Sequence, residues 1–123
     1  MAEMTRSILV IDDNPAIRRT LTRILNKHGY TVDTAHSGSE AIQMFTTQIY
    51  LAAVIDVGLG DMQGTDLLPQ MHAVAPQMLR IILTGTPMSE VELNQAKTDA
   101  DVFLLKPVKP ETVLGILKER LGL

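Results

Sequence analysis

The 123-residue sequence contains no cysteine and no tryptophan, and it has only two phenylalanines and two tyrosines. Without cysteine the chain cannot form a disulfide, a thiolate zinc site or a cysteine nucleophile, which fits a reducing compartment. No apolar run reaches the roughly 20 residues that a membrane-spanning helix needs, and the first residues lack the apolar region of a signal peptide. We therefore expect a soluble, cytoplasmic protein without a membrane segment.

The charge pattern gives no sign of nucleic-acid binding. The net charge is −3, and the sequence has no dense cluster of lysine and arginine that would bind a phosphate backbone. Arg18, Arg19 and Arg23 fall on one predicted helix, where we expect them to form a solvated face. The length suits one domain covering residues 1–123.

Short apolar runs recur roughly every 20 to 30 residues with helical periodicity between them, which predicts alternating strands and helices and a parallel sheet. The predicted strands are 7–11, 31–35, 51–55, 80–83 and 102–105. Four of them are apolar on both faces, as expected of strands covered by helices on both sides. The polar run 31–34 suits a sheet edge. The pattern predicts an α/β doubly wound fold, which binds ligands beyond the carboxyl ends of its strands.

The first two of the predicted helices, and a later one, have clear start signals. Asn14 can cap the first helix, Pro15 fits its first position, and Gly29 follows its end. Ser37–Glu40 and Ser89–Glu92 both have the spacing of a capping box.

The other two helices are predicted at about 65–71 and 110–121. Pro69 falls near the first turn of the former, so its start is less sharply defined. The last helix has an inward face of apolar residues, namely Val113, Leu114, Leu117 and Leu121.

Polar side chains end four of the predicted strands. They are Asp12 and Asp13, Asp56, Thr84 and Lys106. Because the carboxyl ends of parallel strands meet at one edge, these side chains should lie together. Each pair of carboxylates would repel by about 3 to 4 kcal/mol at 4–5 Å and an effective dielectric of 20. One lysine cannot neutralise three acids, so the cluster should bind a cation, and its oxygen ligands suit Mg²⁺ or Mn²⁺ better than zinc.

The histidines are not expected to take part in this site. His28, His36 and His72 are scattered along the chain, and His28 is better explained by the end of the first helix. An aspartate beside a divalent cation can instead act as a nucleophile and form an aspartyl-phosphate. Mg²⁺, an ammonium and a hydroxyl would stabilise the transferred phosphoryl group.

The motifs at these strand ends resemble those of a known family. Val10–Pro15, Val54–Asp56, Gly64, Leu83–Gly85 and Leu105–Pro107 together resemble the receiver domain of two-component response regulators, over the whole chain. The resemblance implies a flavodoxin-like, five-stranded parallel sheet of order 2-1-3-4-5 with five helices.

The resemblance also implies a role for each acidic residue. Asp56 matches the phosphoacceptor, which takes a phosphoryl group from a phosphohistidine of a sensor histidine kinase or a histidine phosphotransfer protein. Asp13, Asp56 and the backbone carbonyl of Gly58 would bind Mg²⁺ directly, and Asp12 would act largely through water. Lys106 would pair with the acids and then with the phosphoryl oxygens.

Two further residues match the switch of the family. Thr84 would move to hydrogen-bond the phosphoryl group, and Phe103 would move with it, by packing alone. Their movement would remodel the face of the fourth helix, fifth strand and fifth helix, through which a homodimer could form. The Lys106–Pro107 peptide bond is cis in most relatives.

The sequence departs from the family just after the phosphoacceptor. Leu59–Gly60 stands where relatives usually have Met-Pro, so the loop has two glycines and should be more mobile. Gly58 and Thr86 occupy positions that tune autodephosphorylation in relatives. Because Gly58 offers no side chain to shield the phosphoryl group, we expect a short-lived phosphorylated form.

Two other functions fit parts of this pattern. The chain could be an interaction module that signals without phosphorylation, although its intact acidic, threonine and lysine positions argue against this. It could also be a phosphatase or phosphotransferase, but such enzymes usually carry Asp-x-Asp after the first strand, and here the order is Asp12–Asp13. The absence of GxxxxGK[ST] and GxGxxG motifs disfavours nucleotide binding. We expect a signalling domain that catalyses only its own phosphotransfer and autodephosphorylation.

Overall fold

The structure is a computed structural model that describes residues 6–85 and 100–122. The elements are β1 (Ser7–Ile11), α1 (Pro15–Lys27), β2 (Thr31–Ala35), α2 (Gly38–Thr47), β3 (Ala52–Asp56), a 3-10 helix η1 (Gly64–Leu67), α3 (Leu68–Val74), β4 (Leu79–Thr84), β5 (Val102–Leu105) and α5 (Pro110–Leu121). The helix predicted to open at Ser89–Glu92 lies outside the described residues, as does Thr86. No helix within the two described ranges is long and apolar enough to cross a membrane.

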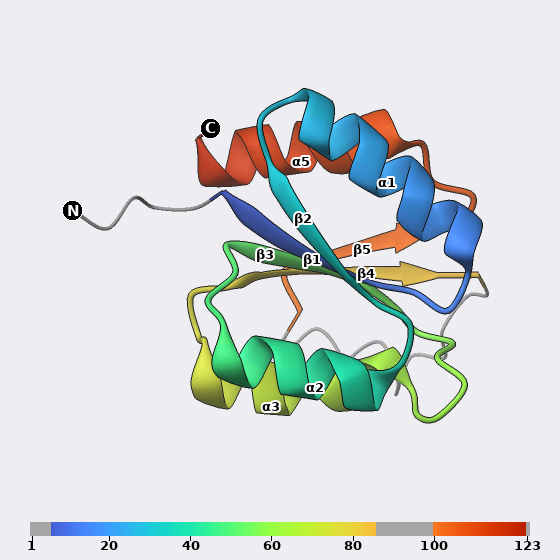
Figure 1. Cartoon of the computed structure of the whole chain (residues 1–123), viewed down its shortest axis with the longest axis vertical. Coiled ribbons are helices and arrows are strands. Elements are labelled where there is room, and N and C mark those ends of the chain that lie inside the picture. The colour runs from blue at the N-terminus through green and yellow to red at the C-terminus, as the bar shows by residue number, and fades with distance from the viewer. Residues whose placement is uncertain (1–5, 86–99, 123) are drawn as a thin grey trace.

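The five strands form one parallel sheet of order β2-β1-β3-β4-β5, which confirms the predicted fold. In Figure 1, α1 and α5 cover one face of this sheet, and α2 and α3 cover the other. The polar strand β2 lies at an edge, as its sequence predicted. All carboxyl ends therefore meet at the same edge of the sheet, where parallel α/β proteins bind their ligands.

The core consists of two apolar clusters, one on each face of the sheet. Leu9 and Ile11 of β1 pack toward the side of α2 and α3, whereas Ile8 and Val10 pack toward the side of α1 and α5. Successive side chains of a strand point to opposite faces, so a strand between two helical layers is mostly apolar on both. This explains why β1 has no polar residue after Ser7.

The helix caps agree with the sequence signals, with one difference. The Asn14 side chain accepts a hydrogen bond from the backbone N–H of Ala16, and Pro15 occupies the first turn of α1. Ser37 Oγ accepts from the N–H of Glu40 at 3.2 Å. Glu40, however, accepts from the N–H of His36 and not from that of Ser37, so the expected capping box forms only in part. The imidazole of His36 at 3.0 Å from the same carboxylate oxygen favours this arrangement.

Two site residues lie within their strands, whereas the sequence analysis placed them just after the strand ends. Asp56 is the last residue of β3 and pairs with Leu83, and Thr84 is the last residue of β4 and pairs with Leu105. The ladders continue one residue further because the neighbouring strand offers a partner at each position. The sheet therefore holds the backbone at both residues.

A close approach at Gly64 offers a test of this fold. A Cβ at Gly64 would collide with the backbone carbonyl of Asp56 and with Ile55. We expect Gly64→Ala to lower the free energy of unfolding by about 1–3 kcal/mol, as overpacking does. Gly115→Ala is the matched control, since nothing lies within 4 Å of a Cβ there and the residue is inside α5. That change should stabilise by about 0.5–1 kcal/mol. Urea denaturation measures both, and equal effects would contradict the packing at Gly64.

Candidate acidic metal site

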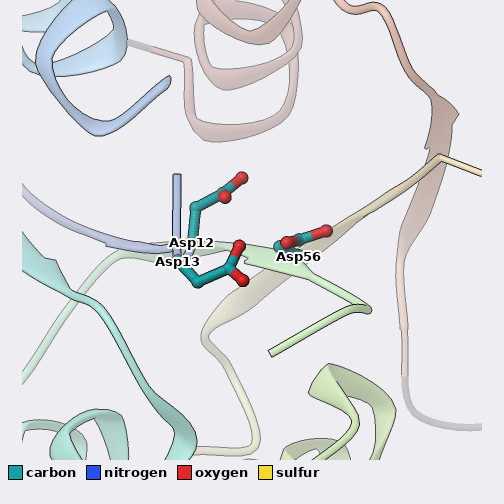
Figure 2. A group of neighbouring side chains, drawn as sticks. All are labelled: Asp12, Asp13 and Asp56. Carbon is teal, nitrogen blue, oxygen red and sulfur yellow. The ribbon is translucent and has the colours of Figure 1, made fainter. Parts of the chain in front are cut away.

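Three carboxylates meet at the carboxyl edge of the sheet, as predicted. One ligand oxygen from each of Asp12, Asp13 and Asp56 lies within 4.8 Å of the others. Figure 2 shows Asp12 and Asp13 just after β1 and Asp56 at the end of the neighbouring β3. Asp12 and Asp56 are buried and Asp13 is exposed, so the cluster is accessible to solvent at Asp13.

Lys106 joins two of the three acids. Its Nζ lies 3.0 Å from Asp56 Oδ1 and 3.3 Å from Asp12 Oδ2. Burial of this ammonium lowers its pKa, but the hydrogen bond to Asp56 and the charges of Asp12 and Asp56 together outweigh burial, so the pKa of Lys106 is raised. The lysine is thus held as a cation among the acids. The Lys106–Pro107 peptide bond is cis, which confirms the expectation from the family.

Asp12 is held by contacts on both its side chain and its backbone. Its Oδ1 accepts a hydrogen bond from the N–H of Asn14 at 2.9 Å, and its carbonyl accepts from Arg18 Nη1 at 2.7 Å. Burial raises the pKa of Asp12, and the charge of Asp56 raises it further, against the Asn14 hydrogen bond and Lys106. Ionisation of Asp12 therefore costs more free energy in the folded protein than in the unfolded chain.

Arg18 corrects the expectation that all three arginines of α1 form a solvated face. Its guanidinium turns back over the first turn of the helix to the Asp12 carbonyl, and the residue is half-buried. Arg19 and Arg23 are exposed. A signal was present in the sequence, since a long donor in the second turn of a helix can reach the backbone that precedes that helix. Composition alone did not distinguish the three arginines.

Thr84 and Phe103 lie on the adjacent strands β4 and β5. Thr84 is buried, and its carbonyl accepts a hydrogen bond from the N–H of Lys106 at 2.7 Å. Phe103 pairs with Ile82 and packs against the cluster on the side of α2 and α3. Gly58 is exposed in the loop after β3. The backbones of Thr84 and Lys106 therefore lie side by side, while the partly buried Phe103 packs against the core from the neighbouring strand β5.

The histidines lie away from the acidic cluster. His28 Nδ1 is 3.0 Å from the Ile24 carbonyl at the end of α1, which confirms the helix-terminus interpretation. His36 pairs with Glu40. His72 Nδ1 is 3.5 Å from Arg80 Nη1. The grouped metal-binding side chains among the described residues are three aspartates, an all-oxygen donor set typical of a Mg²⁺ site.

The receiver-domain family matches this chain. The model of the response regulator receiver domain matches residues 8–118, and the chain belongs to this family. The alginate biosynthesis transcriptional regulatory protein AlgB of Pseudomonas syringae pv. tomato is 34% identical over 104 residues, which are 85% of this chain and 23% of AlgB. The chain thus spans about a quarter of the length of that relative.

Solved structures agree in fold and in the nature of the site. A CheY-like receiver protein from Methanospirillum hungatei has a TM-score of 0.89 and 33% identity, covering 96% of this chain and 94% of its own. A response regulator from Burkholderia pseudomallei, solved with a phosphorylated aspartic acid, a calcium ion and citrate, has a TM-score of 0.82 and 31% identity, covering 95% and 71%. TrrA from Thermotoga maritima, in complex with Mg²⁺-BeF, has a TM-score of 0.81 and 26% identity, covering 94% and 98%.

These findings define the class of the protein. The chain is a receiver domain of the two-component type, with its phosphorylation site in the acidic pocket of Asp12, Asp13 and Asp56. It is a signalling domain rather than an enzyme acting on an external substrate.

Because the ionised Asp12 is buried near another carboxylate, removing its charge should make the folded protein more stable. Because burial raises the pKa of Asp12, its ionisation costs free energy in the folded state at neutral pH. In metal-free buffer, Asp12→Asn should therefore increase the free energy of unfolding, on the order of 1 kcal/mol. As the pH falls through the raised pKa, the folded wild type gains the proton and the difference should shrink.

Urea denaturation with a chelator, over a series of pH values, measures this difference. Saturating Mg²⁺ should raise the melting temperature of the wild type more than that of the variant, because the ion binds the folded state. A variant less stable than the wild type in metal-free buffer at neutral pH would mean that attraction to Lys106 outweighs repulsion and burial.

Proposed function

We propose that residues 1–123 form a single phosphorylation-dependent receiver in which Asp56 is the phosphoacceptor. The observation that carries the proposal is the buried Asp56 carboxylate, 3.0 Å from Lys106 Nζ and grouped with Asp12 and Asp13. An oxygen of Asp56 would form the new O–P bond while the N–P bond of a phosphohistidine breaks and the imidazole leaves. Such a carboxylate nucleophile needs neighbouring cations, and the site supplies one ammonium and the ligands for a metal ion.

The metal ligands we propose are Asp13, Asp56 and the backbone carbonyl of Gly58, for Mg²⁺ or Mn²⁺. Asp12 would act largely through water, because its two carboxylate oxygens already contact Asn14 and Lys106. Asp13 is exposed and belongs to the same group of carboxylates, which supports its direct contact. A bound Mg²⁺ neutralises charge on the phosphoryl oxygens during transfer.

Lys106 and Thr84 would stabilise the phosphoryl group after transfer. The raised pKa of Lys106 keeps its ammonium charged, so it can leave Asp12 and donate to a phosphoryl oxygen. We assign Thr84 the hydrogen bond to another phosphoryl oxygen, because β4 ends beside β3 at this edge. Phe103 would follow the threonine by repacking.

An apolar cavity supports docking of a histidine donor next to this site. The cavity is about 480 Å³ and lies between α1 and the segment that links β5 to α5. Its wall includes Ala16, Ile17, Pro107 and Val108, and Lys106 borders it. We propose that apolar side chains on a helix of a sensor histidine kinase or a histidine phosphotransfer protein fill this cavity and bring the phosphohistidine over Asp56.

We propose that the fourth helix, β5 and α5 form the surface that changes on phosphorylation and transmits the signal to a partner. Leu105 of β5 is 56% exposed, a large apolar residue available to a partner. A homodimer through this face follows as a further proposal, with the fourth helix expected outside the described residues.

We propose that the domain works in the cytoplasm and contacts neither nucleic acid nor membrane itself. The competing function, an interaction module independent of phosphorylation, would use the same faces.

Intact mass spectrometry separates these functions. With Mg²⁺ and acetyl phosphate, the wild type should gain one phosphoryl group, and Asp56→Asn should gain none, because the nucleophile is lost. Glu119→Gln, which removes an exposed carboxylate on α5, is the control and should gain one. No gain in the wild type would favour the phosphorylation-independent module, and steady hydrolysis of unrelated phosphoesters would favour an enzyme.

A second variant tests the docking cavity. Ala16→Glu places a charge at the wall of the cavity without filling a core position, since Ala16 is exposed. Desolvating that unpaired charge should slow phosphotransfer from the histidine donor by about tenfold or more. Phosphorylation by acetyl phosphate should stay within about twofold of the wild type, because the chemistry at Asp56 is unchanged.

Gln43→Glu, on the exposed side of α2, is the matched control and should leave both reactions unchanged. Equal phosphotransfer by Ala16→Glu and the wild type would contradict docking at this cavity.

A further inference from the structure

The loop that carries Gly58 is closed by backbone contacts between its two ends, and its side chains contact α2. This acceptor loop, residues 57–63, is narrowed by an antiparallel bridge between Gly58 and Gln63. The N–H of Gly64 donates to the Val57 carbonyl at 2.8 Å, which closes its base. Neither Gly58 nor Gly60 has an atom within 4 Å of where a Cβ would stand. These two glycines contribute no packing, and the loop is anchored to the core on the side of α2 and α3 by the buried side chain of Leu59 between them.

Asp61 adds a polar contact between the loop and α2. Its Oδ1 accepts a hydrogen bond from the N–H of Gly38 at 2.9 Å, and its Oδ2 accepts from the N–H of Ser39 at 3.0 Å. These two amides lie in the first turn of α2, where backbone donors have no partner within the helix. One carboxylate thus caps a helix that begins 23 residues earlier in the chain. These hydrogen bonds, Gly38 first and Ser39 next, lower the pKa of Asp61.

Met62 adds an apolar contact at the same place. A Cβ at Gly38 would collide with the Met62 side chain, so the absence of a side chain at Gly38 lets the two segments approach. Met62 is half-buried against the core cluster on the side of α2. The acceptor loop is therefore held to α2 by a charged cap and by a packed side chain next to it.

We propose that Asp61 is a positioning residue that sets the Gly58 carbonyl for the divalent cation by tying the acceptor loop to α2. The inference rests on the proposed role of Gly58 as a metal ligand. Two glycines give the loop many conformations, and ordering a residue costs roughly 1–2 kcal/mol. Asp61 restricts those conformations before the metal arrives, so less ordering remains to oppose binding.

Two variants separate this role from simple helix capping. Asp61→Ala removes the tie between the loop and α2. Glu40→Ala removes the other carboxylate of the first turn of α2, which contacts His36 and not the acceptor loop. Both should lower stability, but only Asp61→Ala should weaken Mg²⁺ binding, by about tenfold as is typical for groups that orient metal ligands. Asp61→Asn keeps one acceptor oxygen and should fall between Asp61→Ala and the wild type.

Isothermal titration with MgCl₂ measures the affinity, and amide hydrogen exchange without metal measures the order of residues 57–63. Asp61→Ala should speed exchange in this loop, whereas Glu40→Ala should leave the exchange and the affinity within about twofold of the wild type. Wild-type affinity and exchange in Asp61→Ala would overturn the proposal and leave Asp61 as a cap only. A wild type that binds no Mg²⁺ would instead overturn the proposed metal site, and with it this role.

Discussion

The mutual repulsion of three carboxylates at one edge of the sheet is the constraint on which the site depends. Asp12 and Asp56 are buried, and Lys106 is the described cation that pairs with both. Burial and the neighbouring charge raise the pKa of Asp12, so the folded chain holds an unfavourable charge arrangement that the proposed divalent ion would relieve. The same imbalance would suit Asp56 to its proposed role as phosphoacceptor, since cations that stabilise the acids would also stabilise phosphoryl oxygens.

The fold creates this imbalance and controls it from several elements. Parallel strands deliver Asp12, Asp56, Thr84 and Lys106 to one edge with their backbones held by the sheet or directly after it. Contacts from outside the acidic group then fix its parts. Arg18 holds the backbone of Asp12, and Asp61 joins the loop after Asp56 to α2. The proposed charge change at Asp56 would therefore act on a site with contacts to α1 and α2 as well as to the strands, as a local event that biases a larger surface requires.

The sequence predicted the strands, the caps at Asn14 and Ser37, and the acidic group with Lys106, because each depends on local pattern or on the shared edge of a parallel sheet. It did not predict the contacts of Arg18 and Asp61. Those depend on where a long side chain turns and on which helix start lies beside a loop, and neither leaves a periodic signal. The two glycines of the loop suggested mobility, which stays a prediction, while the structure adds an anchor that counting glycines could not reveal. The roles of Thr84 and Phe103 also remain proposals based on the family.

Crystals soaked in Mn²⁺, with anomalous data collected at the manganese edge, test the central claim that these carboxylates form one cation site. We expect a single strong anomalous peak bound by Asp13, Asp56 and the Gly58 carbonyl, with Asp12 reaching it through water. A peak elsewhere, with none at this edge of the sheet, would contradict it.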